Sequence, residues 1–178
     1  MSWLAYFKRW ASKYDREVEA YGYQPHKLLL PFRALIGKRK RGLDVGCGTG
    51  KSLEVMAKFC EEVLGVEPVE KMAKRAEDRG FRVLRMRGEE VGKLREKEAQ
   101  FDLVSFFASI DYMKVDEVVE GVNRILAPDG LVFMTVEPEN EDKLKLLFGK
   151  QDFEVVKRVS RKAYERQTYI CLLFKKQS

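Results

Sequence analysis

The residues best suited to chemistry are a carboxylate, Asp44, and the glycines Gly46, Gly48 and Gly50, all within the stretch LDVGCGTGKS at residues 43–52. An apolar strand that runs into a glycine loop lets a ligand approach the main chain closely, because glycine has no side chain to keep it away. Several classes of ligand are bound by loops of this kind. Glycine spacing and the charge of nearby side chains distinguish them.

Spacing argues against two of these classes. A triphosphate-binding loop has the pattern GxxxxGK[ST], and counting back five residues from Gly50 reaches Val45 instead of a glycine. A dinucleotide-binding loop has the pattern GxGxxG, and from Gly46 the third glycine position falls on Lys51, where helix and strand must pack closely. The loop therefore predicts neither a nucleoside triphosphate nor a dinucleotide as its ligand.

Charge points to a third class. A carboxylate at Asp44 would repel a polyphosphate a few ångströms away, whereas it would favour a ligand with positive charge. S-adenosylmethionine has a sulfonium and an ammonium group and no phosphate. Glu67 follows the second predicted strand, where an acid can accept hydrogen bonds from both hydroxyls of a ribose. Together, Asp44 and Glu67 predict an S-adenosylmethionine site.

The elements that must position these residues alternate along the chain from residue 42 onward. Strands are predicted at 43–45, 62–66, 81–86, 101–107 and 131–136, and helices at 51–59, 69–80, 115–126 and 141–148. Alternation of this kind requires right-handed crossovers and a parallel sheet covered on both faces. Two last strands, 153–160 and 168–176, have only a short polar connection between them, so they should be antiparallel.

The segment before this alternation has a helical pattern. Apolar and aromatic residues recur every three or four positions, as expected for one amphipathic helix over the first twenty residues: Trp3, Phe7, Trp10, Tyr14, Val18 and Tyr21. Pro25 and Pro31 bracket a second short segment. We interpret the chain as one domain, 1–178, with an N-terminal helical lid segment at 1–36 and an α/β core at 37–178.

Composition limits the partners. The chain has 178 residues, 45% of them hydrophobic, which suits one domain, and its net charge of +6 comes from interspersed acids and bases. Three cysteines without CxxC spacing and one histidine are too few ligands for a zinc site, so we expect no metal. Neither a signal peptide nor an apolar run of membrane-spanning length is present in this sequence. We expect a cytoplasmic location and no membrane partner.

The densest basic run, residues 38–41, is predicted to be a solvated loop before the first strand. It would lie at the amino edge of the sheet, whereas ligands of such sheets bind at the carboxyl edge. A nucleic-acid partner is therefore not expected.

On these residues the sequence resembles the class I S-adenosylmethionine-dependent methyltransferases of the small-molecule type, over nearly the whole chain. LDVGCGTG resembles the first motif, GVEP (65–68) the ribose-binding acid, and RGEEV (87–91) the adenine-contacting loop. FDLVSFF and RILAPDGLVFMTV resemble the segments around the fourth and fifth strands. The resemblance implies a Rossmann-like, doubly wound, mostly parallel seven-stranded sheet with a C-terminal antiparallel hairpin, and S-adenosylmethionine as cofactor.

The resemblance also implies roles for particular residues. The acid and glycines of the first motif would surround the methionine part, with Cys47 contributing main chain, and one of Gly88, Glu89 and Glu90 would meet the adenine. Tyr14 would cover the cofactor, although the aromatic stripe to which it belongs could equally be core, and one of Phe106 and Phe107 would flank the adenine or the methyl group. The predicted cofactor-binding set is Tyr14, Asp44, Gly46, Cys47, Gly48, Glu67, Pro68, Gly88, Glu89, Glu90 and Phe106.

Methyl transfer from a sulfonium chiefly requires that the acceptor be aligned and water excluded, and it requires a base only if the acceptor must lose a proton. Candidate bases are His26, Asp111, Tyr112 and Glu137, and no catalytic residue is assigned.

The loop after the fourth strand reads SFFAS (105–109), without the (Asn/Asp)-Pro-Pro-(Tyr/Phe) motif of enzymes that methylate amino groups of bases or glutamine. We therefore expect a small-molecule acceptor. An RNA or protein methyltransferase, and a binding protein that performs no transfer, stay as alternatives. The sequence does not predict the oligomeric state.

Overall fold

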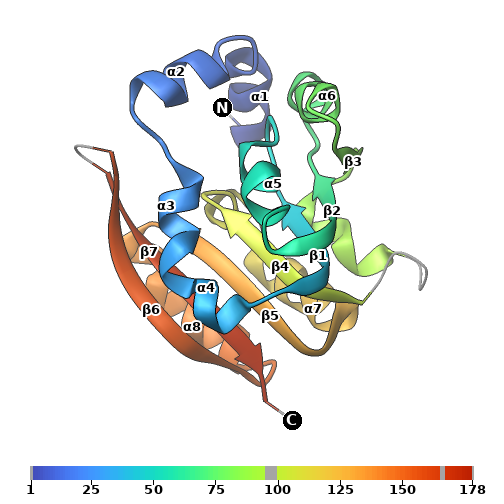
Figure 1. Cartoon of the computed structure of the whole chain (residues 1–178), viewed down its shortest axis with the longest axis vertical. Helices are drawn as coiled ribbons and strands as arrows, with labels where there is room; N and C mark the ends of the chain where they lie inside the picture. The colour runs from blue at the N-terminus through green and yellow to red at the C-terminus, as the bar shows by residue number, and fades with distance from the viewer. Residues whose placement is uncertain (1, 95–99, 165–166, 178) are drawn as a thin grey trace.

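The computed structural model describes residues 2–94, 100–164 and 167–177 and has a seven-stranded sheet at its centre (Figure 1). The strands are β1 (Arg39–Val45), β2 (Cys60–Val66), β3 (Arg82–Leu84), β4 (Phe101–Phe107), β5 (Leu126–Val136), β6 (Phe153–Tyr164) and β7 (Gln167–Lys176). Their order is β3-β2-β1-β4-β5-β7-β6. Strands β1 to β5 are parallel, and β7 is antiparallel to both β5 and β6. The predicted α/β fold is confirmed, including the antiparallel C-terminal pair.

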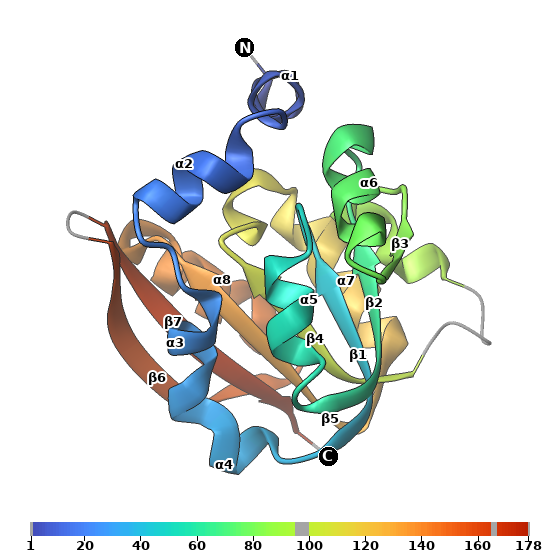
Figure 2. The same cartoon turned by 45° about the horizontal axis from the view of Figure 1, so that its top comes forward.

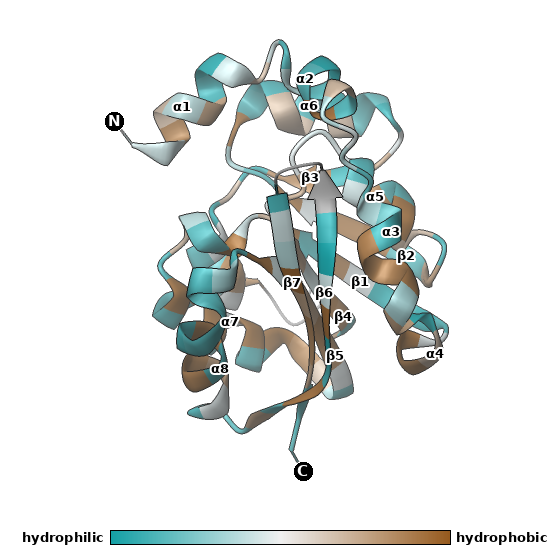
Figure 3. Cartoon of the chain, turned by 90° about the vertical axis from the view of Figure 1, so that its left-hand side faces the viewer, coloured by the Kyte–Doolittle hydropathy of each residue, from teal (hydrophilic) through white to brown (hydrophobic). Residues whose placement is uncertain are grey.

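Helices cover both faces of the sheet (Figure 3). One face carries α3 (Pro25–Leu29), α4 (Arg33–Ile36) and α5 (Lys51–Met56), and the other carries α7 (Val115–Ile125) and α8 (Glu141–Gly149). Strand β4 is almost continuously apolar and buried, as expected for a central parallel strand with helices on both sides. Successive residues of β4 can therefore pack into different core clusters. Phe106 packs into the cluster that includes α7, and Phe107 into the cluster that includes α3 and α5.

Two of the connections differ from the predicted pattern. The basic run at 38–41 is not a loop, because β1 begins at Arg39 and the main-chain N–H groups of Lys40 and Arg41 donate to the Asp102 carboxylate at 3.2 and 2.8 Å. Residues 126–130, which extend from the end of the predicted helix at 115–126 to the predicted strand at 131–136, belong to β5, with Asp129 at a φ of 61°. The basic run nevertheless lies at the amino end of β1, as predicted.

The N-terminal segment forms two helices where one was predicted. Helix α1 (Trp3–Trp10) ends at Ala11, which is fully buried, and α2 (Tyr14–Ala20) begins three residues later. No residue of α1 is buried, and Val18 is the buried residue of α2. Figures 1 and 2 show both helices at the same end of the molecule as α6 (Glu70–Asp78), so this segment rests on the edge of the core.

The remaining short helices lie in connections: η1 (Leu30–Phe32) joins α3 to α4, and the other three follow strands, namely η2 (Gly88–Lys93), η3 (Ile110–Tyr112) and η4 (Pro138–Asn140). Within the described ranges, no helix combines the length and the apolar character needed to cross a membrane.

Candidate functional site

The glycine loop that follows β1 has a main-chain conformation that residues with side chains rarely adopt. Gly46 and Gly48 have φ angles of 78° and 55°, in the left-handed region that favours glycine. A Cβ atom at Gly46 would lie 2.5 Å from the Cβ of Ser109, so a side chain cannot fit there. A Cβ at Gly48 would meet nothing within 4 Å, which leaves the main chain open on that side. The main-chain N–H groups of Gly46 and Cys47 donate to the carbonyl of Val66 and so tie the loop to the end of β2.

The loop borders a partly open pocket, whose empty space of about 540 Å³ includes space open to solvent. It lies where the carboxyl ends of β1, β2 and β4 meet, under α1. Its lining residues are Trp3, Phe7, Tyr14, Gly46, Gly48, Glu67, Pro68, Met72, Gly88, Phe107, Ala108, Ser109, Tyr112 and Met113. Six predicted cofactor-binding residues line it: Tyr14, Gly46, Gly48, Glu67, Pro68 and Gly88.

Glu67 connects the pocket wall to the glycine loop. One oxygen of its carboxylate accepts a hydrogen bond from the N–H of Gly48 at 3.0 Å, and the other accepts one from the N–H of Val69 at 2.8 Å. The side chain belongs to a residue that is only 5% exposed, and this burial raises the pKa of Glu67 to about 7, against the opposing effect of the two hydrogen bonds. Glu67 is thus a carboxylate that changes charge near neutral pH.

Asp44 lies beneath the loop and is fully buried. Its carboxylate accepts hydrogen bonds from the hydroxyls of Ser52 and Ser105, the second at 2.7 Å. Burial raises the pKa of Asp44 to about 6, although both hydroxyls favour the charged form. Asp44 was predicted to surround the methionine part of the cofactor, but it does not line the pocket and lies behind the glycines.

Cys47 and the phenylalanines of β4 are also placed by the packing. A Cβ at Gly65 would be 2.6 Å from the Cys47 sulfur, which shows that this thiol packs against β2. Burial raises the pKa of Cys47 well above its usual value, so the thiol stays neutral. Of the two phenylalanines considered for the site, Phe106, which was included in the predicted set, is fully buried in the core below α7, whereas Phe107 lines the pocket. Successive strand residues point to opposite faces, so only one of the two can reach it.

The three residues proposed for adenine contact have different environments. Gly88 lines the pocket, and a Cβ there would be 2.4 Å from the Met113 sulfur. One carboxylate oxygen of Glu89 accepts from the N–H of Lys114 at 3.1 Å, whereas the other, Oε2, is buried without a hydrogen-bond partner and lies 3.7 Å from the Nε of Arg87. Glu90 folds back to the N–H of Arg87 and to Lys93, away from the pocket.

Aromatic residues of α1 and η3 close the pocket. The rings of Phe7 and Tyr112 are 5.3 Å apart, and those of Trp10 and Tyr14 are 4.8 Å apart. The guanidinium of Arg87 lies 5.6 Å from the ring centre of Trp3, which links α1 to the loop after β3. This contact, together with the small cluster of Ala11, Val69 and Met72, holds the helix over the pocket.

The candidate bases do not converge. Tyr112 lines the pocket, but His26 is exposed on α3 and borders a different hollow. Asp111 accepts hydrogen bonds from the N–H of Glu137 and the amide of Asn140, at 3.2 and 2.8 Å, so it holds the segment after β5. Burial raises the pKa of Asp111.

Several lining residues lie outside the predicted set. Ala108, Ser109 and Met113 follow β4, and Ser109 donates its hydroxyl to the carbonyl of Val45 at 2.6 Å. Their position just after the fourth strand is the signal that could have found them, because ligands bind beyond the carboxyl ends of such strands. Trp3 and Phe7 belonged to the aromatic stripe whose core and site interpretations were both open.

Comparisons with known proteins agree with this geometry. A family model described as "Methyltransferase domain" matches residues 43–134, which is just over half of the chain. A probable S-adenosylmethionine-dependent methyltransferase of Saccharomyces cerevisiae, CRG1, is 29% identical over 116 residues, or 60% of this chain and 39% of the yeast protein. An uncharacterized protein of Methanocaldococcus jannaschii is 29% identical over 136 residues, or 74% of this chain and 50% of that protein. The chain thus spans half or less of the length of these two relatives.

Among solved structures, one from Thermotoga maritima is described as an S-adenosylmethionine-dependent methyltransferase and possible histamine N-methyltransferase. It superposes with a TM-score of 0.73 at 22% identity, covering 96% of this chain and 98% of that one. At this identity the likeness supports the shared fold.

Proposed function

The chain belongs to the family of methyltransferase domains, and on that premise we propose that it transfers a methyl group from S-adenosylmethionine to a small-molecule acceptor. The predicted methyltransferase family is confirmed by the family model. The S-adenosylmethionine-dependent yeast relative supports the proposal that the protein is an enzyme with this methyl donor. The class of acceptor, and the residues that bind donor and acceptor, are proposals.

The pocket residues fit this donor. The open side of Gly48 gives room for main-chain contact. Glu89 does not line the pocket but follows the lining residue Gly88, and its buried Oε2 atom, 3.7 Å from the Nε of Arg87, lacks a hydrogen-bond donor. The exocyclic amino group of adenine is such a donor. A buried acceptor without a partner is costly, so a ligand that supplies one gains binding energy there.

Glu67 is the observation that carries the proposal. Its carboxylate lines the pocket while it grips the loop at Gly48, and each of its oxygens has two lone pairs, of which the N–H groups use one. The remaining lone pairs can accept hydrogen bonds from both ribose hydroxyls. Asp44, behind the glycines, adds a negative charge near the place of the sulfonium.

S-adenosylmethionine supplies a methyl group that is already activated on a sulfonium, so the protein must mainly hold and align the reactants. Trp3, Phe7 and Tyr14 cover the pocket from α1 and α2, and Tyr112 closes it from η3. These rings keep water away from the reacting atoms and offer an apolar wall to the acceptor. Of the four candidate bases, Tyr112 lines the pocket and the other three do not. No residue is assigned as a base.

A small acceptor is supported by the closure of the pocket beneath α1 and by the place of the basic run. The run at 38–41 occupies the amino end of β1, on the far edge of the sheet from the pocket. An RNA chain bound there would not lead into the site.

Two measurements test this function. Calorimetric titration should give micromolar affinity for S-adenosylmethionine and S-adenosylhomocysteine, and no appreciable binding of ATP or NAD. Tight binding of ATP would overturn the interpretation of the glycine loop. Incubation with donor labelled in the methyl group, and with fractionated metabolites, RNA and protein, should label a metabolite. Label found only in RNA or protein would contradict the small-molecule acceptor.

A further inference from the structure

Asp15 joins three separate parts of the molecule through one carboxylate. Its Oδ1 atom accepts a hydrogen bond from the Thr49 hydroxyl at 2.5 Å, and Thr49 belongs to the glycine loop. Its Oδ2 atom lies 3.3 Å from Arg79 and 3.6 Å from Arg75, both on α6. Arg75 also donates to the main-chain carbonyl of Ser12, just before α2, at 2.9 Å. The start of α2, the glycine loop and α6 therefore meet at this side chain.

The glycine loop is consequently held from two sides. Glu67 holds the N–H of Gly48 from the end of β2, and Asp15 holds the next residue, Thr49, from the N-terminal segment. Thr49 is 1% exposed and lies between two glycines with positive φ, so its hydroxyl is a buried group at a point of the loop where the flanking residues have no side chains. A charge-assisted hydrogen bond to a buried hydroxyl is directional, and it defines one position of the loop relative to α2.

Tyr14 directly precedes Asp15 and lines the pocket. We propose that Asp15 is a positioning residue: by binding Thr49 it makes the position of the N-terminal helices depend on the conformation of the cofactor loop, and so sets Tyr14 and Trp3 over the bound cofactor. This rests on the proposed use of the pocket for S-adenosylmethionine. It adds a residue that does not line the pocket and that no contact with the cofactor would reveal.

A second link between α2 and the loop region provides a matched control. Glu19 accepts from Lys51, the residue after Gly50, at 2.5 Å, but its side chain is 66% exposed. Exposed ion pairs contribute little, because water and salt screen them. If charge between α2 and the loop were all that mattered, Glu19 and Asp15 should behave alike.

The chain contains two tryptophans, Trp3 and Trp10, and both lie in α1. Tryptophan emission therefore reports on this helix alone, while calorimetry reports on binding. S-adenosylhomocysteine should change the emission of the unaltered protein, because Trp3 lines the pocket. Absence of calorimetric binding by the unaltered protein would contradict the proposed function itself, and it would be seen before any variant is compared.

We expect Asp15→Ala and Thr49→Val to weaken binding of S-adenosylhomocysteine by about threefold to tenfold. This is less than the full effect of one lost hydrogen bond to a charged group, because Asp15 acts on the ligand only through the loop. In both variants the emission change at saturating ligand should be largely lost. Asp15→Asn, which keeps an acceptor for Thr49, should be intermediate. Thr49→Ser, which keeps the hydroxyl, should restore both readouts, and Glu19→Gln should leave both within twofold of the unaltered protein.

If Asp15 and Thr49 had a merely structural role, their variants would melt at a lower temperature, but ligand that does bind would still produce the full change in tryptophan emission. The inference is overturned if Asp15→Ala and Thr49→Val bind the ligand with unaltered emission change, or if Thr49→Ser behaves as Thr49→Val. It is also overturned if Glu19→Gln has as large an effect as Asp15→Asn. Should Asp15→Ala fail to fold, Thr49→Val and Thr49→Ser give the same decision.

Discussion

Glu67 and Glu70 are three residues apart and have opposite environments. Glu67 is 5% exposed, and burial raises the pKa of its carboxyl to about 7. The side chain of Glu70 is 71% exposed, and hydrogen bonding from Arg85 lowers the pKa of its carboxyl. One carboxylate is destabilised by its surroundings and the other is stabilised, although Glu67 directly follows β2 and Glu70 begins α6, only three residues later.

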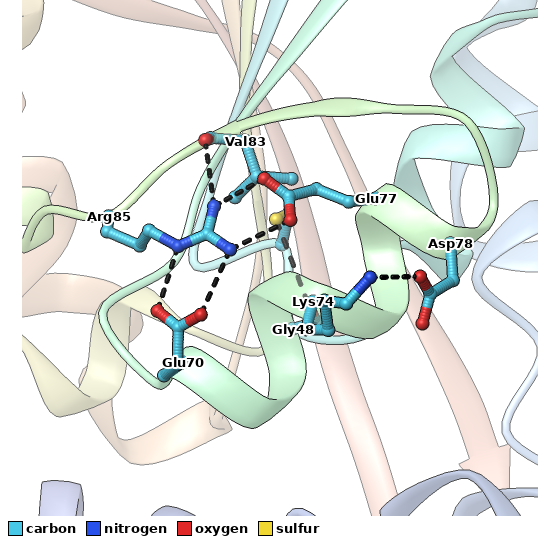
Figure 4. A network of polar contacts seen from close by, with 8 residues as sticks. Gly48, Glu70, Lys74, Glu77, Asp78, Val83 and Arg85 are labelled. Atoms are coloured by element: carbon cyan, nitrogen blue, oxygen red, sulfur yellow. Dashed lines mark hydrogen bonds and ion pairs between the residues drawn. The ribbon is translucent and has the colours of Figure 1, made fainter.

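Figure 4 shows the outer network to which Glu70 belongs. The guanidinium of Arg85 donates to Glu70 through Nε and Nη2, at 2.8 and 3.1 Å, and to Glu77 through Nη2 at 2.8 Å. Lys74 pairs with Asp78 at 2.6 Å on the next turn. These pairs tie the residue after β3 to α6, at the surface, where solvent would satisfy the same groups if the pairs were absent.

Burial distinguishes these two kinds of carboxylate. A charge placed in a dry site without a cationic partner costs free energy, and such a cost is typical of binding and catalytic sites. Asp44 and Glu67 both carry that cost, whereas the outer acids have Arg85 and Lys74 beside them. The inner pair should therefore govern cofactor binding, and the outer pairs should barely affect it.

The largest expected effect is that of Glu67→Ala. Loss of a charged acceptor of two hydroxyls typically costs about 1.5–3 kcal/mol, so affinity for S-adenosylhomocysteine should fall about 10- to 100-fold by calorimetry. Glu67→Gln keeps one acceptor without the charge and should give an intermediate loss. Affinities of Glu67→Ala and Glu70→Ala that agree within twofold would remove the distinction between inner and outer acids.

The next effect concerns pH. Cofactor binding needs the Glu67 carboxylate, so with a pKa of about 7 the affinity should fall about tenfold between pH 8 and pH 6. The free protein should show the opposite trend, because a raised pKa means that the folded state holds the proton more tightly than the unfolded chain. Its stability contribution from Glu67 is present at low pH and is lost as pH rises from about 4.5 to about 7.

Calorimetry across this pH range checks the first trend, and urea unfolding without ligand checks the second. Glu67→Gln should flatten both curves. A flat affinity curve for the unaltered protein would show that burial does not perturb Glu67 as the structure indicates.

A smaller effect is expected of Asp44→Asn, which keeps partners for Ser52 and Ser105 but removes the charge. Because Asp44 does not line the pocket, its effect should come from attraction to the sulfonium. Binding of S-adenosylmethionine should weaken roughly threefold to tenfold, and binding of the neutral thioether S-adenosylhomocysteine should weaken less. Equal losses for both ligands, measured by parallel titrations, would favour a purely structural role beneath the loop.

The smallest effect is expected of Glu70→Ala. Arg85 keeps Glu77 as a partner, so affinity for S-adenosylhomocysteine should stay within twofold and the melting temperature should fall only slightly. A loss comparable to that of Glu67→Ala would show that the outer network positions the ribose-binding segment. In that case α6 would also contribute to cofactor binding.

Much of the fold follows from the sequence because its signals are local. The apolar runs of β1, β2 and β4, and the short link between β6 and β7, define a parallel sheet with an antiparallel end. The break between α1 and α2 was not predicted, because the aromatic spacing continues across it. It depends on the burial of Ala11 against Val69 and Met72, which are distant in sequence.

The site was predictable where a motif fixes the main chain, as at Gly46, Gly48 and Glu67. It was not predictable where strand register, or a partner distant in sequence, determines which side chain reaches the pocket. The choice between Phe106 and Phe107 depends on which face of β4 the helices α3 to α5 cover, and sequence spacing leaves this open. The roles of Glu89 and Glu90 differ because Arg87 and Lys114 bind them in different ways.

Strand β6, the last strand of the sheet, has one further consequence. A strand at the edge of a sheet leaves a row of main-chain groups open to pairing with another chain. Strand β6 carries the exposed residues Arg161 and Lys162, and its register shifts between Val155 and Lys157. Two copies brought edge to edge would meet like charges and an irregular strand. We therefore expect this edge to disfavour aggregation by sheet extension, and the effect should weaken as added salt screens the charges.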